Sequence, residues 1–191
     1  MTTATLEQAT RTNWVIDPTH SLVEFSAKHL MITTVKGRFG GVRGAIGLDA
    51  VTPSRSSVEV TIDAASVDTR VEQRDQHLRS ADFLDVERYP DITFRSLRVE
   101  GPTAAPGDEF RLIGTLTIHG VAREVALAAT FEGQAKDPWG GQRVSFSATT
   151  KIDRRDFGLT WSQALETGGL LVGNEIKISL EVQATQAIDV R

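Results

Sequence analysis

Residues 109–132 read EFRLIGTLTIHGVAREVALAATFE, and this stretch contains the pattern that decides the fold. Apolar or small residues occupy every second position in two runs, 110–118 and 125–131, which His119-Gly120 separates. Because successive side chains of a strand point to opposite faces, each run predicts a strand with one apolar and one polar face. Glycine tolerates the positive φ of a two-residue turn, so the stretch predicts an antiparallel hairpin.

The same alternation recurs along most of the chain, in segments 22–28, 57–64, 144–152 and 175–184, and more weakly in 36–49 and 91–100. One-sided alternation favours antiparallel pairing, so we expect an all-β fold of about eight strands. Such strands can close into an up-and-down barrel or stack as a sandwich, and closure removes the unpaired edges. An eight-stranded barrel is either filled by side chains or holds one small ligand.

Two stretches break the alternation. Residues 69–88 contain Thr69-Arg-Val-Glu72, a capping-box spacing that predicts a helix start, with Leu78, Phe83 and Leu84 as its buried face. Residues 153–173 are too long for an ordinary connection, and they contain Trp161. They predict either a lid or a surface loop that plugs one end of the fold. We interpret Asp153-Arg-Arg-Asp156 and Arg74-Asp75 as local ion pairs that fix these stretches.

Composition excludes several classes of protein. The 191 residues carry a net charge of −4 and no cysteine, which excludes disulfide scaffolds, thiolate metal sites and cysteine nucleophiles and argues against a nucleic-acid partner. Residues 1–13 are polar and show no secretory signal, so we expect a flexible tail before a single domain over 14–191, in a cytoplasmic protein. Aromatic residues are too few, at 6%, for the girdles of a membrane barrel, so we expect no stable membrane insertion.

No catalytic residue, metal site or cofactor is predicted. His20, His29, His77 and His119 lack the spacing of metal ligands, and no nucleophile elbow, phosphate loop or dinucleotide fingerprint is present. Acid–base chemistry by the first three histidines on a bound amphiphile remains an open alternative to a protein that is not an enzyme.

Dispersed motifs resemble a known family. They occur in this order: Trp14-Val-Ile-Asp-Pro-Thr-His-Ser21 with Val23-x-Phe25, Val35-Lys-Gly-Arg-Phe39, Asp68-Thr69, Arg74-Asp-x-His-Leu-Arg-Ser80-x-Asp-Phe83, Tyr89-Pro-x-Ile-Thr-Phe-x-Ser96, Gly114-x-Leu-Thr-Ile-His-Gly-Val121, Ile152-Asp-Arg, Asp156-Phe-Gly158 and Val172-Gly173. Over residues 14–184 the chain resembles the YceI-like family of polyisoprenoid-binding, lipocalin-like proteins. The resemblance implies an extended eight-stranded antiparallel up-and-down barrel, with one or two short flanking helices and an apolar interior that holds a long isoprenoid.

We therefore expect a carrier or store of a polyisoprenoid, an isoprenoid quinone or a fatty amphiphile, held by apolar contact. An interaction module with a filled barrel core is the alternative, and a homodimer stays open. The side chains expected to line the tube are Phe25, Phe39, Val60, Phe94, Leu116, Phe146 and Ile178, and Trp161 is expected to close its mouth.

Overall fold

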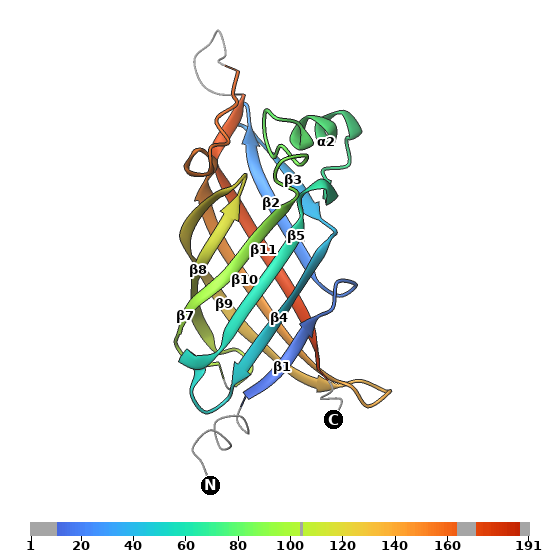
Figure 1. Ribbon diagram of the computed structural model, residues 1–191, viewed down its shortest axis with the longest axis vertical. Helices are drawn as coiled ribbons and strands as arrows, with labels where there is room; N and C mark the ends of the chain where they lie inside the picture. Colours follow the sequence, from blue (N-terminus) through green and yellow to red (C-terminus); the bar gives the residue numbers. More distant parts are fainter. Residues whose placement is uncertain (1–10, 104, 164–170, 188–191) are drawn as a thin grey trace.

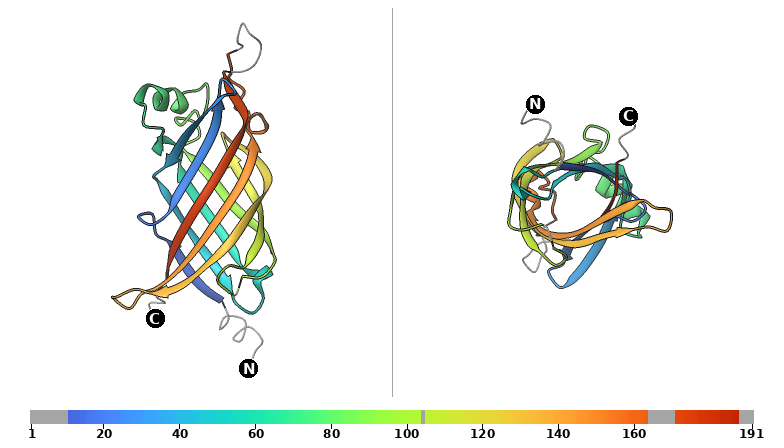
Figure 2. Two further views of the ribbon diagram at one scale, coloured as in Figure 1. Left: turned by 180° about the vertical axis from the view of Figure 1, so that it is seen from behind. Right: turned by 90° about the horizontal axis from the view of Figure 1, so that it is seen from below.

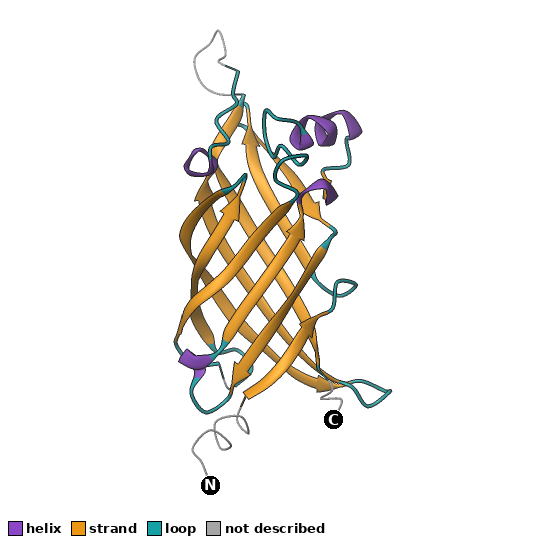
Figure 3. Ribbon diagram, viewed as in Figure 1, coloured by secondary structure: helices purple, strands orange, loops and turns teal. Residues whose placement is uncertain are grey.

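Antiparallel strand segments dominate the computed structural model of the protein, which describes residues 11–103, 105–163 and 171–187 (Figures 1 and 3). The segments are β1 (Arg11–Ile16), β2 (Leu22–His29), β3 (Thr33–Phe39), β4 (Val42–Asp49), β5 (Ser57–Asp63), β6 (Val67–Asp68), β7 (Asp91–Glu100), β8 (Glu109–Ile118), β9 (Val121–Lys136), β10 (Gln142–Asp153) and β11 (Val172–Gln186).

Three of the eight barrel strands are interrupted, and each of these three consists of two segments. Segments β1 and β2 follow one another along β11, with Ile16 opposite Ala184 and Leu22 opposite Glu181. In the same way, β4 and β3 pair with β1 and β2, and β5 and β6 pair with β4 and β3. The remaining strands, β7 to β11, are continuous neighbours in chain order.

Pairing between β1 and β11 closes the ring of strands, which is seen end-on in Figure 2 (right). The closed antiparallel up-and-down barrel of eight strands confirms the fold that the family resemblance implies, and it decides between the barrel and the sandwich that the alternating pattern left open. Closure pairs the edge strands, so neither is left as a template for aggregation. The predicted strand 36–49 is broken at Gly40-Gly41, whose two amides donate to the Ser66 hydroxyl at 3.2 and 3.0 Å.

The predicted hairpin at His119-Gly120 is confirmed. The two residues join β8 to β9 with φ of 52° and 72°, the positive values of a type I′ turn. A side chain at Gly120 would also collide with the Tyr89 ring, 2.5 Å from the position of its Cβ. Glycine is therefore required by both backbone conformation and packing.

Helical structure flanks the barrel in the described residues. It comprises α2 (Glu72–Arg79) and the short 3-10 turns η1 (Pro53–Arg55), η2 (Ala64–Ser66) and η3 (Arg154–Phe157). Figure 1 shows α2 beside one end of the barrel, the end that also holds the β2–β3 turn. Among the described residues, no helix combines the length and apolar character needed to cross a bilayer.

Two sequence predictions near this helix and at the N-terminus are corrected. The helix starts at Glu72 without a side-chain cap, because Thr69 donates its hydroxyl to Asp75 at 2.5 Å. Arg74 also binds Thr69, through its hydroxyl at 2.7 Å, so threonine contacts fix this stretch in place of the predicted Arg74–Asp75 ion pair. The barrel begins at Arg11, inside the predicted tail 1–13, because Arg11 to Val15 pair with β4; residues 1–10 lie outside the described part.

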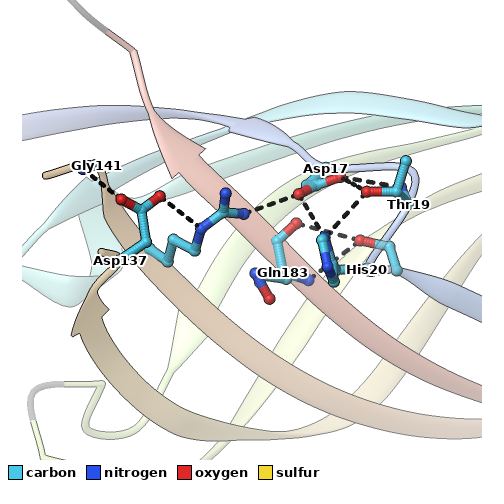
Figure 4. A network of polar contacts seen from close by, with 8 residues as sticks. Asp17, Thr19, His20, Asp137, Gly141 and Gln183 are labelled. Carbon is cyan, nitrogen blue, oxygen red and sulfur yellow. Dashed lines mark hydrogen bonds and ion pairs between the residues drawn. The ribbon is translucent and has the colours of Figure 1, made fainter. Parts of the chain in front are cut away.

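A polar network joins the break between β1 and β2 to the β9–β10 hairpin (Figure 4). The Asp17 carboxylate accepts hydrogen bonds from the Thr19 hydroxyl at 2.6 Å and from Arg143 at 2.9 Å. Arg143 also donates to Asp137 at 3.1 Å. The pKa of Asp17 lies well below its usual value, chiefly because the Thr19 hydroxyl and then His20 hydrogen-bond its charged form.

Asp17→Asn should therefore lower the free energy of unfolding at pH 7 by about 1–3 kcal/mol, the range for hydrogen bonds to a charged group. Because the pKa of Asp17 is depressed in the folded state, its contribution is full above the unfolded pKa near ~3.9 and is lost as the pH falls below it. Urea titrations of both proteins at neutral and acidic pH measure this. The exposed pair Asp91–Arg43 gives the control Asp91→Asn, expected to be near neutral. A difference that does not change with pH would contradict the assignment to Asp17.

Candidate ligand-binding site

The barrel interior encloses a cavity of about 270 Å³, close to the lower end of the ~300–1,000 Å³ typical of small-molecule sites. Every strand segment contributes to its wall, as does Leu78 of α2. The inward positions of the alternating pattern supply these side chains, so the cavity runs along the barrel and not into one loop. A filled core, the alternative left open by the sequence, does not describe this interior.

The chemistry of the wall is that of hydrocarbon. The surface that faces the cavity is apolar, and several of its few polar residues are hydrogen-bonded elsewhere, as Thr150 is to the Ala126 carbonyl at 2.9 Å. Among the described residues, no buried side-chain nitrogen or oxygen lacks a hydrogen-bond partner. The interior therefore offers a ligand apolar contact and no free donor, and a polar head group finds no partner inside it.

Arg154 is the buried charged residue at this wall, with a side chain that is 3% exposed. Its guanidinium donates to the backbone carbonyls of Leu159, Trp161, Val172 and Gly173 at 2.5–3.3 Å. Burial lowers the pKa of this group from its usual value. Its donors are directed to the chain itself, and they tie η3 to the start of β11.

The structure places six of the eight predicted site residues in the cavity wall: Phe25, Phe39, Phe94, Leu116, Phe146 and Ile178. Phe25 and Phe39 lie against one another on β2 and β3, with ring centroids 5.4 Å apart. Phe146 packs between Phe131 and Phe110 toward the other end of the barrel. Contact of these side chains with a ligand stays a prediction.

Val60 and Trp161 are placed differently. Val60 packs into the core, but the cavity wall on β5 is made by its neighbours Val58 and Ile62. Trp161 is outside the wall and packs on His77 and Phe83, at ring-centroid distances of 4.7 and 5.2 Å. Since Phe83 itself lines the cavity, Trp161 contacts the wall from behind. Residues 164–170, the rest of the long predicted connection, lie outside the described residues.

Sequence reasoning missed the end wall of the cavity. Leu78, Phe83 and Leu84 were expected only as a buried helix face, and they line the cavity at the end where α2 lies. It also omitted in-phase strand residues of the wall, among them Ile16, Ile46, Leu112, Ile118, Leu127 and Ile152. The period-two pattern marks those strand positions, whereas only tertiary packing brings the helix over the barrel end.

The histidines lie among the described residues, and none of the four lines the cavity, although His77 packs on Phe83 from outside. His20 lies 2.8 Å from Asp17 in the exposed network, His77 lies 2.8 Å from Asp82, and His119 packs on Tyr89. His29 ends β2 and is likewise outside the wall. Acid–base chemistry on a molecule in the cavity therefore has no geometric support from these residues. No cluster of three metal-ligating side chains occurs in the described ranges.

Fold and cavity together define a class: a closed antiparallel barrel of lipocalin-like architecture with an apolar interior, which supports binding of an apolar molecule in general. The sequence profile of the YceI-like domain matches residues 14–184. The chain belongs to the YceI-like family, as the resemblance of its motifs implies.

Relatives and solved structures agree. The protein YceI of Salmonella newport is 43% identical over 141 residues, which cover 74% of this chain and 72% of the relative. The Campylobacter jejuni YceI structure superposes with a TM-score of 0.70 at 34% identity, covering 84% of this chain and 90% of that one. A domain from Saccharophagus degradans described as polyisoprenoid-binding has a TM-score of 0.67 at 17% identity, over 91% of this chain and 98% of that one, and shows the fold alone.

Proposed function

We propose that the protein binds one long apolar or amphiphilic molecule inside the barrel and carries, stores or sequesters it. The ligand class is a polyisoprenoid, an isoprenoid quinone or a fatty amphiphile. The observation that supports the proposal most directly is the cavity inside the barrel, whose surface is apolar and whose described wall leaves no buried side-chain donor or acceptor without a partner. The polyisoprenoid-binding description of the Saccharophagus degradans domain supports the same ligand class.

Apolar burial alone can supply the affinity. Each buried CH₂ contributes about 0.8 kcal/mol, so a chain of several isoprene units gains enough to offset the cost of association. A polar head group would cost free energy inside this wall, and it therefore stays at the rim in the proposed complex. The proposed role involves no reaction of the ligand, and the cytoplasmic location and the homodimer stay predictions.

Solvent extraction of the purified protein followed by mass spectrometry tests the proposal. We expect a co-purifying lipid, and after its removal, uptake of geranylgeraniol with a Kd in the micromolar range or tighter. Trp161 should report uptake by fluorescence, because it packs on Phe83 of the cavity wall. Trp161→Phe is the matched control: it should remove most of the signal and leave uptake measured by mass spectrometry unchanged. A protein without co-purifying lipid that also takes up no prenyl chain would overturn the proposal.

A further inference from the structure

The β2–β3 turn holds three consecutive apolar side chains in solvent. Leu30, Met31 and Ile32 are 37%, 57% and 75% exposed, the most concentrated group of exposed large apolar residues in the described chain. Isolated exposed apolar residues are ordinary on protein surfaces, but a contiguous group at one projecting turn marks an interaction site.

The backbone of this turn suits its side chains poorly. Leu30 and Met31 have φ of 52° and 61°, and the Ile32 amide donates to the His29 carbonyl at 3.1 Å, as in a type I′ turn. Asn-Gly fits this turn without strain, whereas leucine and methionine carry a steric penalty at both positions. The two side chains are therefore held outward at a cost to stability, and strain of this kind concentrates at functional sites.

The turn lies at one rim of the cavity. The Leu30 amide donates to the Leu171 carbonyl at 2.9 Å, and His29 pairs with Val172, which lines the cavity. Figure 1 shows the turn at the barrel end beside α2, whose Leu78 also contributes to the cavity wall. The exposed apolar residues and the entry to the interior thus share one end of the molecule.

Three exposed lysines lie on the outer face just behind the turn. Lys36 and Lys177 flank Ser26 from the two neighbouring strands, and Lys28 is two residues before Leu30. None of the three forms an ion pair within the described residues, whereas Lys151, opposite Lys177, pairs with Glu175 at 3.3 Å. The surface thus combines an apolar tip with unpaired positive charge behind it.

We propose that this end of the barrel docks on the surface of an anionic phospholipid bilayer. Leu30, Met31 and Ile32 enter the boundary between head groups and acyl chains, and the lysines contact anionic head groups, the arrangement of peripheral membrane-binding surfaces. The docking surface stands on its own observations, and it extends the proposed function because a cavity rim at a bilayer gives a lipid chain a path that avoids water.

Vesicle flotation with Leu30→Asn/Met31→Gly tests the docking surface. Wild-type protein should bind vesicles of two parts phosphatidylcholine to one part phosphatidylglycerol, more strongly at low salt, and bind pure phosphatidylcholine about tenfold more weakly. The double variant should lose about tenfold or more of its partition into the mixed vesicles. Its Tm should rise by about 2–4 °C, because Asn-Gly relieves the turn, so unfolding cannot imitate the result.

Trp139→Ser is the matched control. Trp139 is 87% exposed at the tip of the β9–β10 hairpin, at the other end of the barrel (Figure 1). Its loss should leave vesicle binding unchanged, and equal losses in both variants would overturn the proposal. Absence of vesicle binding by the wild-type protein would overturn the proposal too. It would also be overturned if the wild type and Trp139→Ser self-associated and the double variant did not, because the turn would then be a contact between copies. Geranylgeraniol uptake without vesicles tests the proposed function separately and should be equal in wild type and double variant.

Discussion

Ala148→Phe combined with Ala129→Phe should weaken uptake of a prenyl chain at least about a hundredfold while the barrel stays folded. The two alanines are direct partners on β10 and β9, and both line the cavity. A hundredfold loss corresponds to about 2.8 kcal/mol, which is the burial of about 110 Å² of apolar surface at ~25 cal/mol per Å². One phenylalanine side chain covers more surface than that, so two rings in a cavity of about 270 Å³ displace the ligand.

Ala128→Phe provides the matched control, since Ala128 is adjacent to Ala129 but exposed on the outer face of β9. It adds the same ring without entering the cavity, and uptake should match wild type. Isothermal titration with geranylgeraniol measures all three proteins, and circular dichroism checks their fold. Undiminished uptake by the double variant would show that the ligand is held outside the barrel.

The alternating pattern was sufficient to predict antiparallel strands with one apolar face, and the family resemblance decided between a barrel and a sandwich. In 109–132 one set of positions faces the cavity or core, and His119-Gly120 fits the turn between the two strands. The other set is mostly exposed or half-buried, with the exception of Ile113, which is buried. The break at Gly40-Gly41 could not be predicted in the same way. The hydroxyl that binds both amides belongs to Ser66, which tertiary structure alone brings to that point.

The capping-box prediction failed for a related reason. Thr69 has the right spacing from Glu72, but its hydroxyl is taken by Asp75 and Arg74, and it is buried against the barrel. A partner within the next turn of the chain competes with the cap, and burial decides between them. The consequence is a helix that starts later and still covers the barrel end through Leu78.

Most of the cavity wall was predictable from strand phase, and the differences within one strand were not. Val58, Val60 and Ile62 share a face of β5, yet Val60 packs into the core and its two neighbours line the cavity. The alternating pattern predicts which side of the sheet a side chain is on, whereas the size of the opposing side chains determines whether it borders empty space in the cavity. Opposite Val60 lies Phe94, whose ring also occupies the space beside Gly114, 2.4 Å from where a Cβ would stand.

Arg154→Met should lower the free energy of unfolding by about 3–5 kcal/mol. The interpretation of residues 153–156 as ion pairs holds for Arg155, which binds Asp153 at 2.6 Å, but Arg154 instead donates to four carbonyls. Methionine keeps apolar volume at the wall and leaves those carbonyls without donors, at about 1–3 kcal/mol for each that stays dry. Removing a buried cation that has no counter-ion also removes the free-energy cost of its desolvation. The expected loss of stability is therefore smaller than the sum for the four carbonyls.

Two comparisons separate the hydrogen bonds of Arg154 from its charge. Arg154→Lys keeps the charge but offers three donors to four acceptor carbonyls. Its free energy of unfolding, measured by urea denaturation, should therefore lie between those of Arg154→Met and wild type. Arg155→Met, beside it on the exposed side, removes a surface ion pair and should cost at most about 1 kcal/mol. If Arg154→Met were as stable as wild type, the desolvation cost of the cation would equal the gain from its four bonds. Arg154 would then serve only to direct the chain from η3 into β11. In that case Arg154→Lys should lower the free energy of unfolding more than Arg154→Met does.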